Sequence, residues 1–268
     1  MRSSRISLAL AALLAVAPCW GDVTFVANGA STVTAGTGTC TPTMPGTILA
    51  NDTLILVACG EGDDVGGTLA LTTANGFALV TGPTNPLSVD NNNGAEADPE
   101  IDCAVWWKKA AGADSAPVVT DSGDHTTCAV HQFRGAKQSG NPWNVAASGN
   151  DGAANDTSAV IPGATTTVVN TLVVLIQGTS NNGTSTTNCG SVTNADLASI
   201  TEQFDSSNTS GLGSGHCLIT GTKATAGAYA VSTLTLGATT FKAAFSIALE
   251  PEPVTCAQST ALLGVGCR

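Results

Sequence analysis

The stretch DNNNGAEADPEID, residues 90–102, gathers carboxylates at nearly alternating positions. Hard oxygen ligands of this kind can hold Ca²⁺. The stretch lacks the Asx at the fifth position and the Gly at the sixth that an EF-hand loop requires. We therefore expect a solvated acidic loop and no cofactor, with a Ca²⁺ site as the alternative. The carboxylates concerned are Asp90, Glu96, Asp98, Glu100 and Asp102.

A second candidate for chemistry is Ser214, which stands between two glycines and close to His216. A serine hydrolase needs a serine with a base in reach, and the chain has no Gly-x-Ser-x-Gly elbow. We expect a Gly/Ser loop that enters the strand HCLITG, residues 216–221. A glycosidase needs two facing carboxylates, and no pair is indicated. The sequence thus predicts no catalytic residue and no enzyme.

Aromatic side chains are scarce, which argues against a sugar-stacking platform. Trp106 and Trp107 are adjacent, so a strand sends them to opposite faces. Trp143, in the segment GNPWN between the two halves of the chain, is the best single candidate for an exposed binding contact. The preferred interpretation is that its ring fills the gap between the halves.

The cysteines predict disulfides, because an even number remains once an N-terminal signal peptide is removed. Zinc is the weaker alternative, since no Cys-x-x-Cys pair is present and the histidines lack finger spacing. We expect nearest neighbours to pair, as Cys40–Cys59, Cys103–Cys128, Cys189–Cys217 and Cys256–Cys267.

Residues 1–21 have the plan of a signal peptide: Arg2 and Arg5 precede the apolar run Ile6–Ala17, which is too short to span a bilayer. We expect cleavage after Gly21 and hence a secreted or extracellular protein. The chain is acidic, with a net charge of −11, which argues against nucleic acid and anionic membranes as partners.

The rest of the chain is poor in charge and shows short β-rich runs between Gly, Asn, Asp and Pro clusters. This pattern predicts an all-β fold, an antiparallel, jelly-roll-like β-sandwich stapled by disulfides, over residues 22–251. The strand at 241–249 alternates, which predicts a core face and a solvated back. Its counterpart at 129–133 places His131 in the core with a hydrogen-bond partner. Residues 252–268 form a C-terminal tail, which we expect a disulfide to close.

Three ordered matches at nearly constant offset predict an internal duplication, with halves at about 44–136 and 161–251. Two halves poor in large apolar side chains would bury little alone, so we expect them to share one core. The matched segments are 53–57 with 171–175, 109–113 with 223–228, and 131–135 with 247–251.

Seven motifs follow in order: VTFVANGAS (23–31), NDTLILVA (51–58), GFALVTG (76–82), WWKKAAGA (106–113), FRGA (133–136), NTLVVLI (170–176) and FSIALEP (245–251). This order resembles a duplicated β-sandwich module of bacterial secreted or surface proteins and of phage tail or virion structural proteins. The chain departs from that plan at Phe77, where a Trp is usual, and at Asn170, where an Asp is usual. The resemblance carries no catalytic residue and implies a structural or adhesive role.

We therefore expect a non-enzymatic extracellular structural or adhesion module, a component of a cell surface or a virion. Its partners would be other surface or virion proteins, or further copies of itself, and the mature chain would have no membrane span. The alternative is a lectin-like module that binds glycans, assisted by calcium. A secreted hydrolase is the least favoured class.

Overall fold

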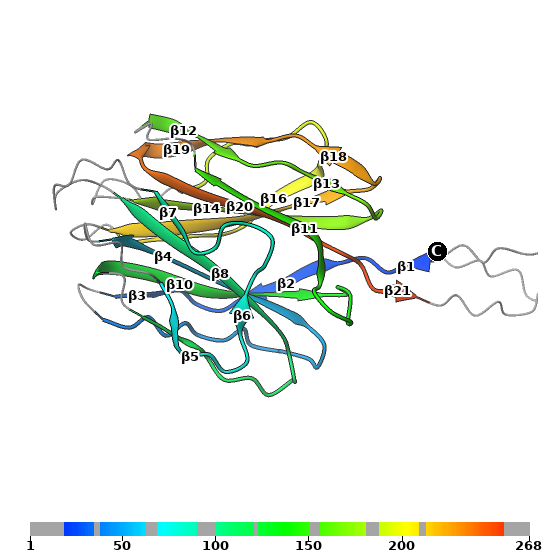
Figure 1. Ribbon diagram of the computed structural model, residues 1–268, viewed down its shortest axis with the longest axis horizontal. Coiled ribbons are helices and arrows are strands. Elements are labelled where there is room, and N and C mark those ends of the chain that lie inside the picture. Colours follow the sequence, from blue (N-terminus) through cyan, green and yellow to red (C-terminus); the bar gives the residue numbers. More distant parts are fainter. Residues whose placement is uncertain are drawn as a thin grey trace, which may run out of the picture.

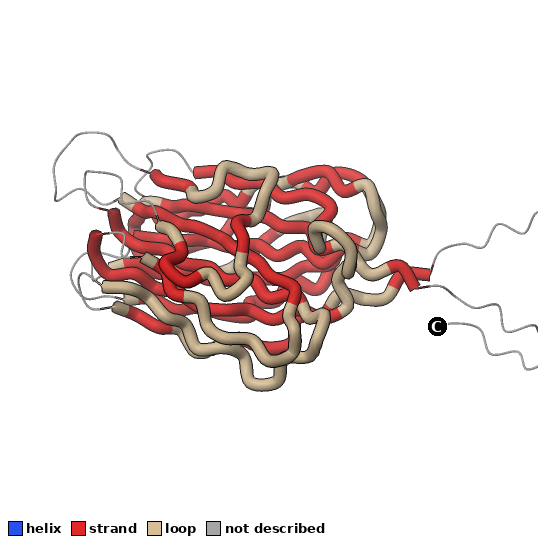
Figure 2. Tube along the Cα trace, turned by 60° about the horizontal axis from the view of Figure 1, so that its bottom comes forward, coloured by secondary structure: helices blue, strands red, loops and turns tan. Residues whose placement is uncertain are grey.

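The computed structural model describes residues 19–34, 38–62, 69–89, 100–120, 123–150, 156–180, 188–208 and 213–254. Every regular element within these ranges is a β-strand, and the strands pair antiparallel (Figure 1, Figure 2). The predicted all-β, antiparallel fold is confirmed. Within the same ranges, no helix is long and apolar enough to cross a membrane.

Two large sheets form the middle of the molecule. The first has the strand order β2-β10-β4-β8-β6, with β3 paired to β10 and β7 paired to β8. Its strands are β2 (Thr24–Asn28), β3 (Thr32–Val33), β4 (Thr53–Gly62), β6 (Ala78–Leu79), β7 (Leu87–Val89), β8 (Ile101–Lys109) and β10 (Gly123–Arg134). The second has the order β11-β20-β14-β17-β16. Its strands are β11 (Trp143–Asn150), β14 (Thr171–Ser180), β16 (Ala198–Ser207), β17 (Ser214–Lys223) and β20 (Lys242–Leu249).

Smaller sheets cover the outer face of each large one, so that Figure 1 shows four stacked layers. Beyond the second large sheet lie a sheet with the strand order β12-β19-β15 and the two-stranded sheet β13-β18. Beyond the first lies the pair β5-β9, to which the segment at Cys40 adds a bridge at Val119. The outer strands are β5 (Leu71–Thr73), β9 (Val118–Val119), β12 (Asp156–Ile161), β13 (Ala164–Thr166), β15 (Val192–Thr193), β18 (Gly227–Tyr229) and β19 (Ser232–Thr240).

Strand periodicity divides the interior into three apolar cores. On β4, Ile55 and Val57 enter a central core between the two large sheets, whereas Leu54 and Leu56 enter an outer core beneath the first sheet. On β14, alternate residues likewise enter the central core and an outer core of the second sheet. Because both faces of these strands are buried, their sequences are continuous apolar runs. We call the central contact the joint, residues 24–134 the N-terminal half and residues 143–249 the C-terminal half.

The expectation of a solvated back on strand 241–249 is wrong. Phe245 and Ile247 of β20 face the joint as expected, but Ala244 and Ala248 on the other face are buried in the outer core. Lys242 on that face is fully buried as well. The sheet β12-β19-β15 covers this back, and alternating small residues give little sign of such a covering layer.

The two large sheets share one strand order, but the matched segments do not all occupy equivalent positions. β2, β10, β4, β8 and β6 follow one another in the first sheet as β11, β20, β14, β17 and β16 do in the second. In the match of 53–57 with 171–175, however, Ile55 faces the joint while Val173 faces the outer core. A shift of one residue exchanges the two faces of a strand, so this sequence match is one residue out of structural register.

Two charged groups are fixed inside the fold. Asp52, at the start of β4, accepts hydrogen bonds from Arg134 Nε and Nη2 at 2.7 and 2.8 Å and from Gln132 Nε2 at 2.6 Å. Lys242 donates from Nζ to Asp156 Oδ1 and to the carbonyl oxygen of Ser158, both at 2.7 Å. Both groups hold the end of a central strand in place.

Two chain segments leave the body together. β1 (Cys19–Trp20) pairs with β21 (Pro253–Val254), and this ribbon projects from one end of the stacked layers (Figure 1). The backbone N–H of Gly21 donates to the carbonyl oxygen of Glu252 at 3.3 Å. Residue 22, where we expect the mature chain to begin, therefore lies where the ribbon meets the body.

Candidate functional site: the buried joint

The joint brings several of the side chains singled out in the sequence into one buried layer. Polar side chains along one side of this layer connect the N-terminal half to β16 and the residue after it. Asn28 Nδ2 donates to the carbonyl oxygen of Gln203 at 2.7 Å, and Ser206 Oγ donates to Ser31 Oγ at 2.8 Å. Asn208 Nδ2 donates to the carbonyl oxygen of Thr34 at 3.0 Å. The edge of the first sheet is thereby fastened to the edge of the second.

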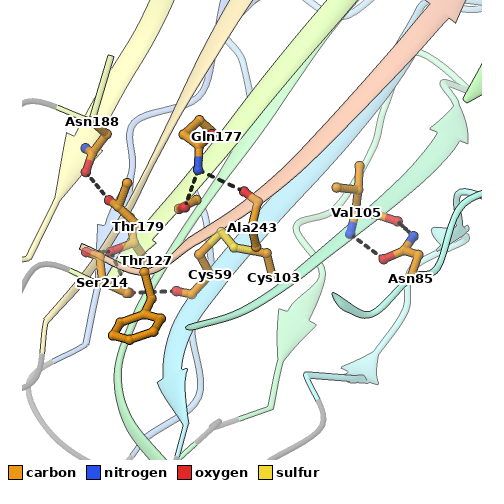
Figure 3. Close-up of a disulfide and its surroundings, with 12 residues drawn as sticks. Cys59, Asn85, Cys103, Val105, Thr127, Gln177, Thr179, Asn188, Ser214 and Ala243 are labelled. Atoms are coloured by element: carbon orange, nitrogen blue, oxygen red, sulfur yellow. Dashed lines mark hydrogen bonds between the residues drawn. A yellow bond between two sulfur atoms is a disulfide. The ribbon is translucent and has the colours of Figure 1, made fainter. Parts of the chain in front are cut away.

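A disulfide lies inside this layer (Figure 3). Cys59 on β4 and Cys103 on β8 are directly opposed in the strand register, and both are buried. Gly178 of β14 packs against their sulfur atoms: a β-carbon there would be 2.0 Å from Cys103 Sγ and 2.6 Å from Cys59 Sγ. The C-terminal half thus contacts the disulfide of the N-terminal half through a residue without a side chain.

The disulfide pairing corrects the nearest-neighbour prediction. Cys40 joins Cys128 and Cys59 joins Cys103, instead of Cys40–Cys59 and Cys103–Cys128. Cys189–Cys217 pairs as predicted, and Cys256 and Cys267 lie outside the described residues. Sheet order explains the difference, because β4 lies between β8 and β10 and so opposes residues distant in sequence.

Ser214 is a structural residue of the joint. Its Oγ lies 2.7 Å from the carbonyl oxygen of Cys59 and 2.6 Å from that of His125, and the residue is fully buried (Figure 3). Among the described residues, neither ring nitrogen of His216 has a hydrogen-bond partner, so His216 is not in contact with Ser214 as a base would be. The arrangement lacks the serine–base contact that a hydrolase requires.

The histidines at the joint form an aromatic cluster with Phe204. His131, on β10, and His216, on β17, have ring centroids 5.7 Å apart, and each ring lies 4.9 Å from Phe204. His131 is a core residue with a partner, as predicted: its Nδ1–H donates to Asn28 Oδ1 at 2.6 Å. Burial lowers the pKa of His216 from 6.5 to about 3 and holds the pKa of His131 well below its usual value, the latter aided by repulsion from His216.

Trp143 also lies at the joint. Its side chain is 8 % exposed, and its ring meets that of Trp107 edge-on at a centroid distance of 5.2 Å. It therefore fills the space between β11 and β8 rather than offering an exposed contact. Trp106, next to Trp107 in sequence, points to the outer core of the N-terminal half, as strand alternation requires.

The acidic stretch is only partly described. Asp90, Glu96 and Asp98 lie outside the described residues. Glu100 and Asp102, at the start of β8, are buried, with Asp102 opposite Gly60 and Ser88. Within the part of the chain that the structure describes, no three His, Cys, Asp or Glu side chains gather closely enough to hold a metal ion.

The outer face of the C-terminal half carries a shallow hollow of about 560 Å³ without a charged side chain. Apolar side chains from β15, β16 and the β18–β19 turn line it beside threonine hydroxyls. Thr193 and Thr233 share a hydrogen bond of 2.7 Å between their Oγ1 atoms. The lining residues are Val192, Thr193, Asn194, Ala195, Ile200, Ala230, Val231 and Thr233.

Sequence reasoning missed the buried Lys242 with its ion pair to Asp156, and the four hydrogen bonds that Asp52 accepts from Leu49, Gln132 and Arg134. The sequence did carry a signal for Asp52: an acidic residue stands just before the strand at 53–62, and Arg134 ends the strand at 123–134. For Lys242, a single lysine in an apolar strand gave no distinguishing signal. Comparison with protein-family models, curated proteins and solved structures found no match to this chain.

Proposed function

We propose that this chain is a non-enzymatic extracellular structural or adhesion module, part of a cell surface or a virion. The observation that carries the proposal is the placement of its disulfides, which are buried in the cores of a four-layer sandwich. Disulfides persist in oxidising compartments outside the cytosol and stabilise a domain mainly by restricting its unfolded chain. A body stapled in this way suits a component that must survive outside the cell.

The use of the polar side chains supports a role without catalysis. Ser214, His131 and Asp52 are buried and bind the fold itself, through contacts that close the joint or fix a strand end. A catalytic group must reach a substrate, whereas each of these residues has at most 1 % of its surface exposed. The signal-peptide-like plan of residues 1–21 and the net charge of −11 agree with an exported protein that does not bind nucleic acid.

The proposal includes an internal duplication of a jelly-roll-like unit. The common strand order of the two large sheets supports this duplication. Two local features outside the central strands, both involving asparagine, also recur in the two halves. Asn51 and Asn170, each just before the first central strand, both have positive φ values, 73° and 57°. Asn75 and Asn194 each donate from Nδ2 to the carbonyl oxygen of an alanine, Ala116 at 2.5 Å and Ala230 at 2.9 Å. Two halves derived from one unit would pack their equivalent faces together at the joint.

The deciding experiment fractionates the native source into whole cells, assembled particles and cell-free supernatant, and follows the protein by mass spectrometry. We expect it to sediment with particles or envelopes and to resist a salt wash. Recovery as a free monomer in the supernatant would overturn the structural role.

A lectin-like function is the second candidate, and the uncharged hollow beside Val231 favours it. Neutral glycans offer hydroxyl groups and apolar C–H faces, which match the Thr193–Thr233 hydroxyl pair and the aliphatic side chains beside it. A glycan array probed with and without calcium tests this candidate. Binding that Val231→Asp abolishes would support it, and binding that this variant leaves unchanged would exclude the hollow.

A further inference from the structure

Two imidazoles are sealed inside the joint without full hydrogen bonding. His131 and His216 are both fully buried. Asn28 Nδ2 donates to Gln203, which turns Asn28 Oδ1 towards His131 Nδ1 and makes that nitrogen the donor. Within the described ranges, His131 Nε2 and both nitrogens of His216 have no hydrogen-bond partner. A buried polar group without a hydrogen-bond partner is less stable than the same group in water. Exposure to water would therefore stabilise both rings.

The joint itself is held by non-covalent contacts among the described residues. Cys40–Cys128 and Cys59–Cys103 lie within the N-terminal half, and Cys189–Cys217 lies within the C-terminal half. Each half also has an outer core of its own. The halves can therefore separate while each keeps its strands and its disulfides.

Few charges surround the two rings. β2 and β14 carry no titratable side chain. On β16, Glu202 is exposed, and Asp205 accepts hydrogen bonds from the backbone and side chain of Asn188. Arg134, on β10, binds Asp52, and Lys223 is at the far end of β17, opposite Thr171. The remaining titratable residues on the packed strands are Glu61 of β4 and Asp124 and His125 of β10.

Burial lowers the pKa of both histidines, and repulsion from His216 adds to this effect at His131, whereas a neighbouring carboxylate would raise the pKa. When both imidazoles are protonated, the charge closest to each ring is the positive charge of the other ring. Two imidazolium ions 5.7 Å apart in an apolar core repel each other, and each would be poorly solvated there.

We propose that acid opens the joint reversibly, because protonation of His131 and His216 drives the two disulfide-stapled halves apart. The closed joint is complete above pH 6.5, the usual value for a free imidazole, and is weakened as the pH falls from there towards 3. Linkage makes the opening equilibrium about thirtyfold larger at pH 5 than at pH 8 for an imidazole such as His216. With two such rings, opening takes up about two protons.

A pair of single cysteines on β14 can separate joint opening from unfolding. Val174→Cys places a thiol at the joint, and Leu175→Cys places one in the outer core of the same half. Labelling of the full chain with a methanethiosulfonate reagent, without reductant, measures how often each site opens. At each pH the rate is divided by that of a free cysteine peptide, because the reagent attacks the thiolate and the thiolate fraction falls about tenfold per pH unit. Between pH 6 and 5, we expect this normalised rate for V174C to rise with a dependence of about two protons, while L175C stays protected.

Histidine variants in the V174C background identify the groups responsible. His216→Leu removes one titrating ring, so we expect the dependence to fall to about one proton. If His216→Leu does not fold, His131→Gln provides the same test. His125→Gln is the matched control, because His125 is partly exposed, and it should leave the dependence at about two. Equal acceleration of V174C and L175C, no acceleration of either, or an unchanged proton number in both histidine variants would overturn the proposal.

Discussion

Gly178 of β14 lies so close to Cys103 of β8 that a β-carbon at residue 178 would be 2.0 Å from the cysteine sulfur. The two residues belong to different halves, and the missing side chain lets the second sheet approach the Cys59–Cys103 disulfide. The same glycine lies opposite His216 in the register of β14 and β17 in the second sheet. The spacing of the two halves therefore depends on a glycine at this position.

We predict that Gly178→Ala lowers the free energy of unfolding by about 3 kcal/mol, because the added methyl group overpacks the joint. Denaturant titration measures the effect. Gly149→Ala in β11 is the control: its β-carbon would meet only Pro162, at 3.7 Å or more, so the change should stay within about 0.5 kcal/mol. In a Cys59→Ala/Cys103→Ala background the sulfur atoms are gone, and the Gly178→Ala penalty should fall below about 1 kcal/mol. An undiminished penalty there would mean that the disulfide is not what the methyl group meets.

Disulfide mapping tests the pairing directly. Proteolysis without reduction, followed by mass spectrometry, should yield linked peptides for Cys40–Cys128, Cys59–Cys103 and Cys189–Cys217. The sequence separations are 88 for the first pair and 28 for the last, so chain entropy predicts about 1 kcal/mol more stability from Cys40–Cys128. A peptide that links Cys40 to Cys59 would contradict the strand order of the first sheet.

Asp52 should make stability depend on pH in the acid range. Burial opposes its ionisation, but hydrogen bonds from Arg134, Leu49 and Gln132 outweigh burial and lower the pKa of the carboxyl below 3.8. A lowered carboxyl pKa stabilises the fold above about pH 3.8 and ceases to do so as the pH falls through the folded value. Asp52→Asn should therefore cost about 2 kcal/mol at pH 7 and progressively less below pH 3.8. Urea titrations of both proteins at several pH values measure this difference, and a constant difference would contradict it.

The buried lysine should show an asymmetry between its two partners. Lys242 is fully buried, whereas the side chain of Asp156 is 54 % exposed. Lys242→Met removes the buried charge and leaves an acid that water can solvate, so the expected cost is below about 1 kcal/mol. Asp156→Ala leaves the ammonium group with less compensation and should cost about 3 kcal/mol. Equal costs in thermal unfolding would show that the carboxylate is not what stabilises the lysine.

Trp143 should behave as a packing residue of the joint. Trp143→Ala removes the ring that meets Trp107 edge-on and leaves a cavity, so we expect a loss of about 3 to 5 kcal/mol. Trp143→Phe keeps an aromatic ring and should cost less than half as much. Denaturant unfolding measures both. A loss below about 1 kcal/mol for the alanine variant would mean that the space collapses or that the ring is not packed.

The sequence predicts local structure here better than it predicts layering. The segments at 53–57, 129–133 and 171–175 all lie within strands, because β-branched and aliphatic residues between turn-forming clusters leave few alternatives. Alternation on β20 gave the correct inner face at Phe245 and Ile247. It did not reveal the outer layer over Ala244 and Ala248, because alanine is compatible with burial and with exposure.

Contacts between distant strands were beyond sequence reasoning. Disulfide partners are set by which strands are neighbours, and the order β10-β4-β8 places Cys59 opposite Cys103 rather than near Cys40. The burial of His131 followed from its strand position, whereas its contact with His216 depends on the packing of two sheets. A spacing within one chain segment carries no information on such packing.

As long as residues 1–21 remain attached, the ribbon of β1 and β21 determines how the chain would respond to tension. Its two strands are antiparallel and place Cys19 beside Val254, at the tip. A force that pulls these residues apart would break the backbone pairs of the ribbon one after another, from the tip inwards, instead of shearing them all at once. Load would reach the stapled layers only after this short zipper had opened.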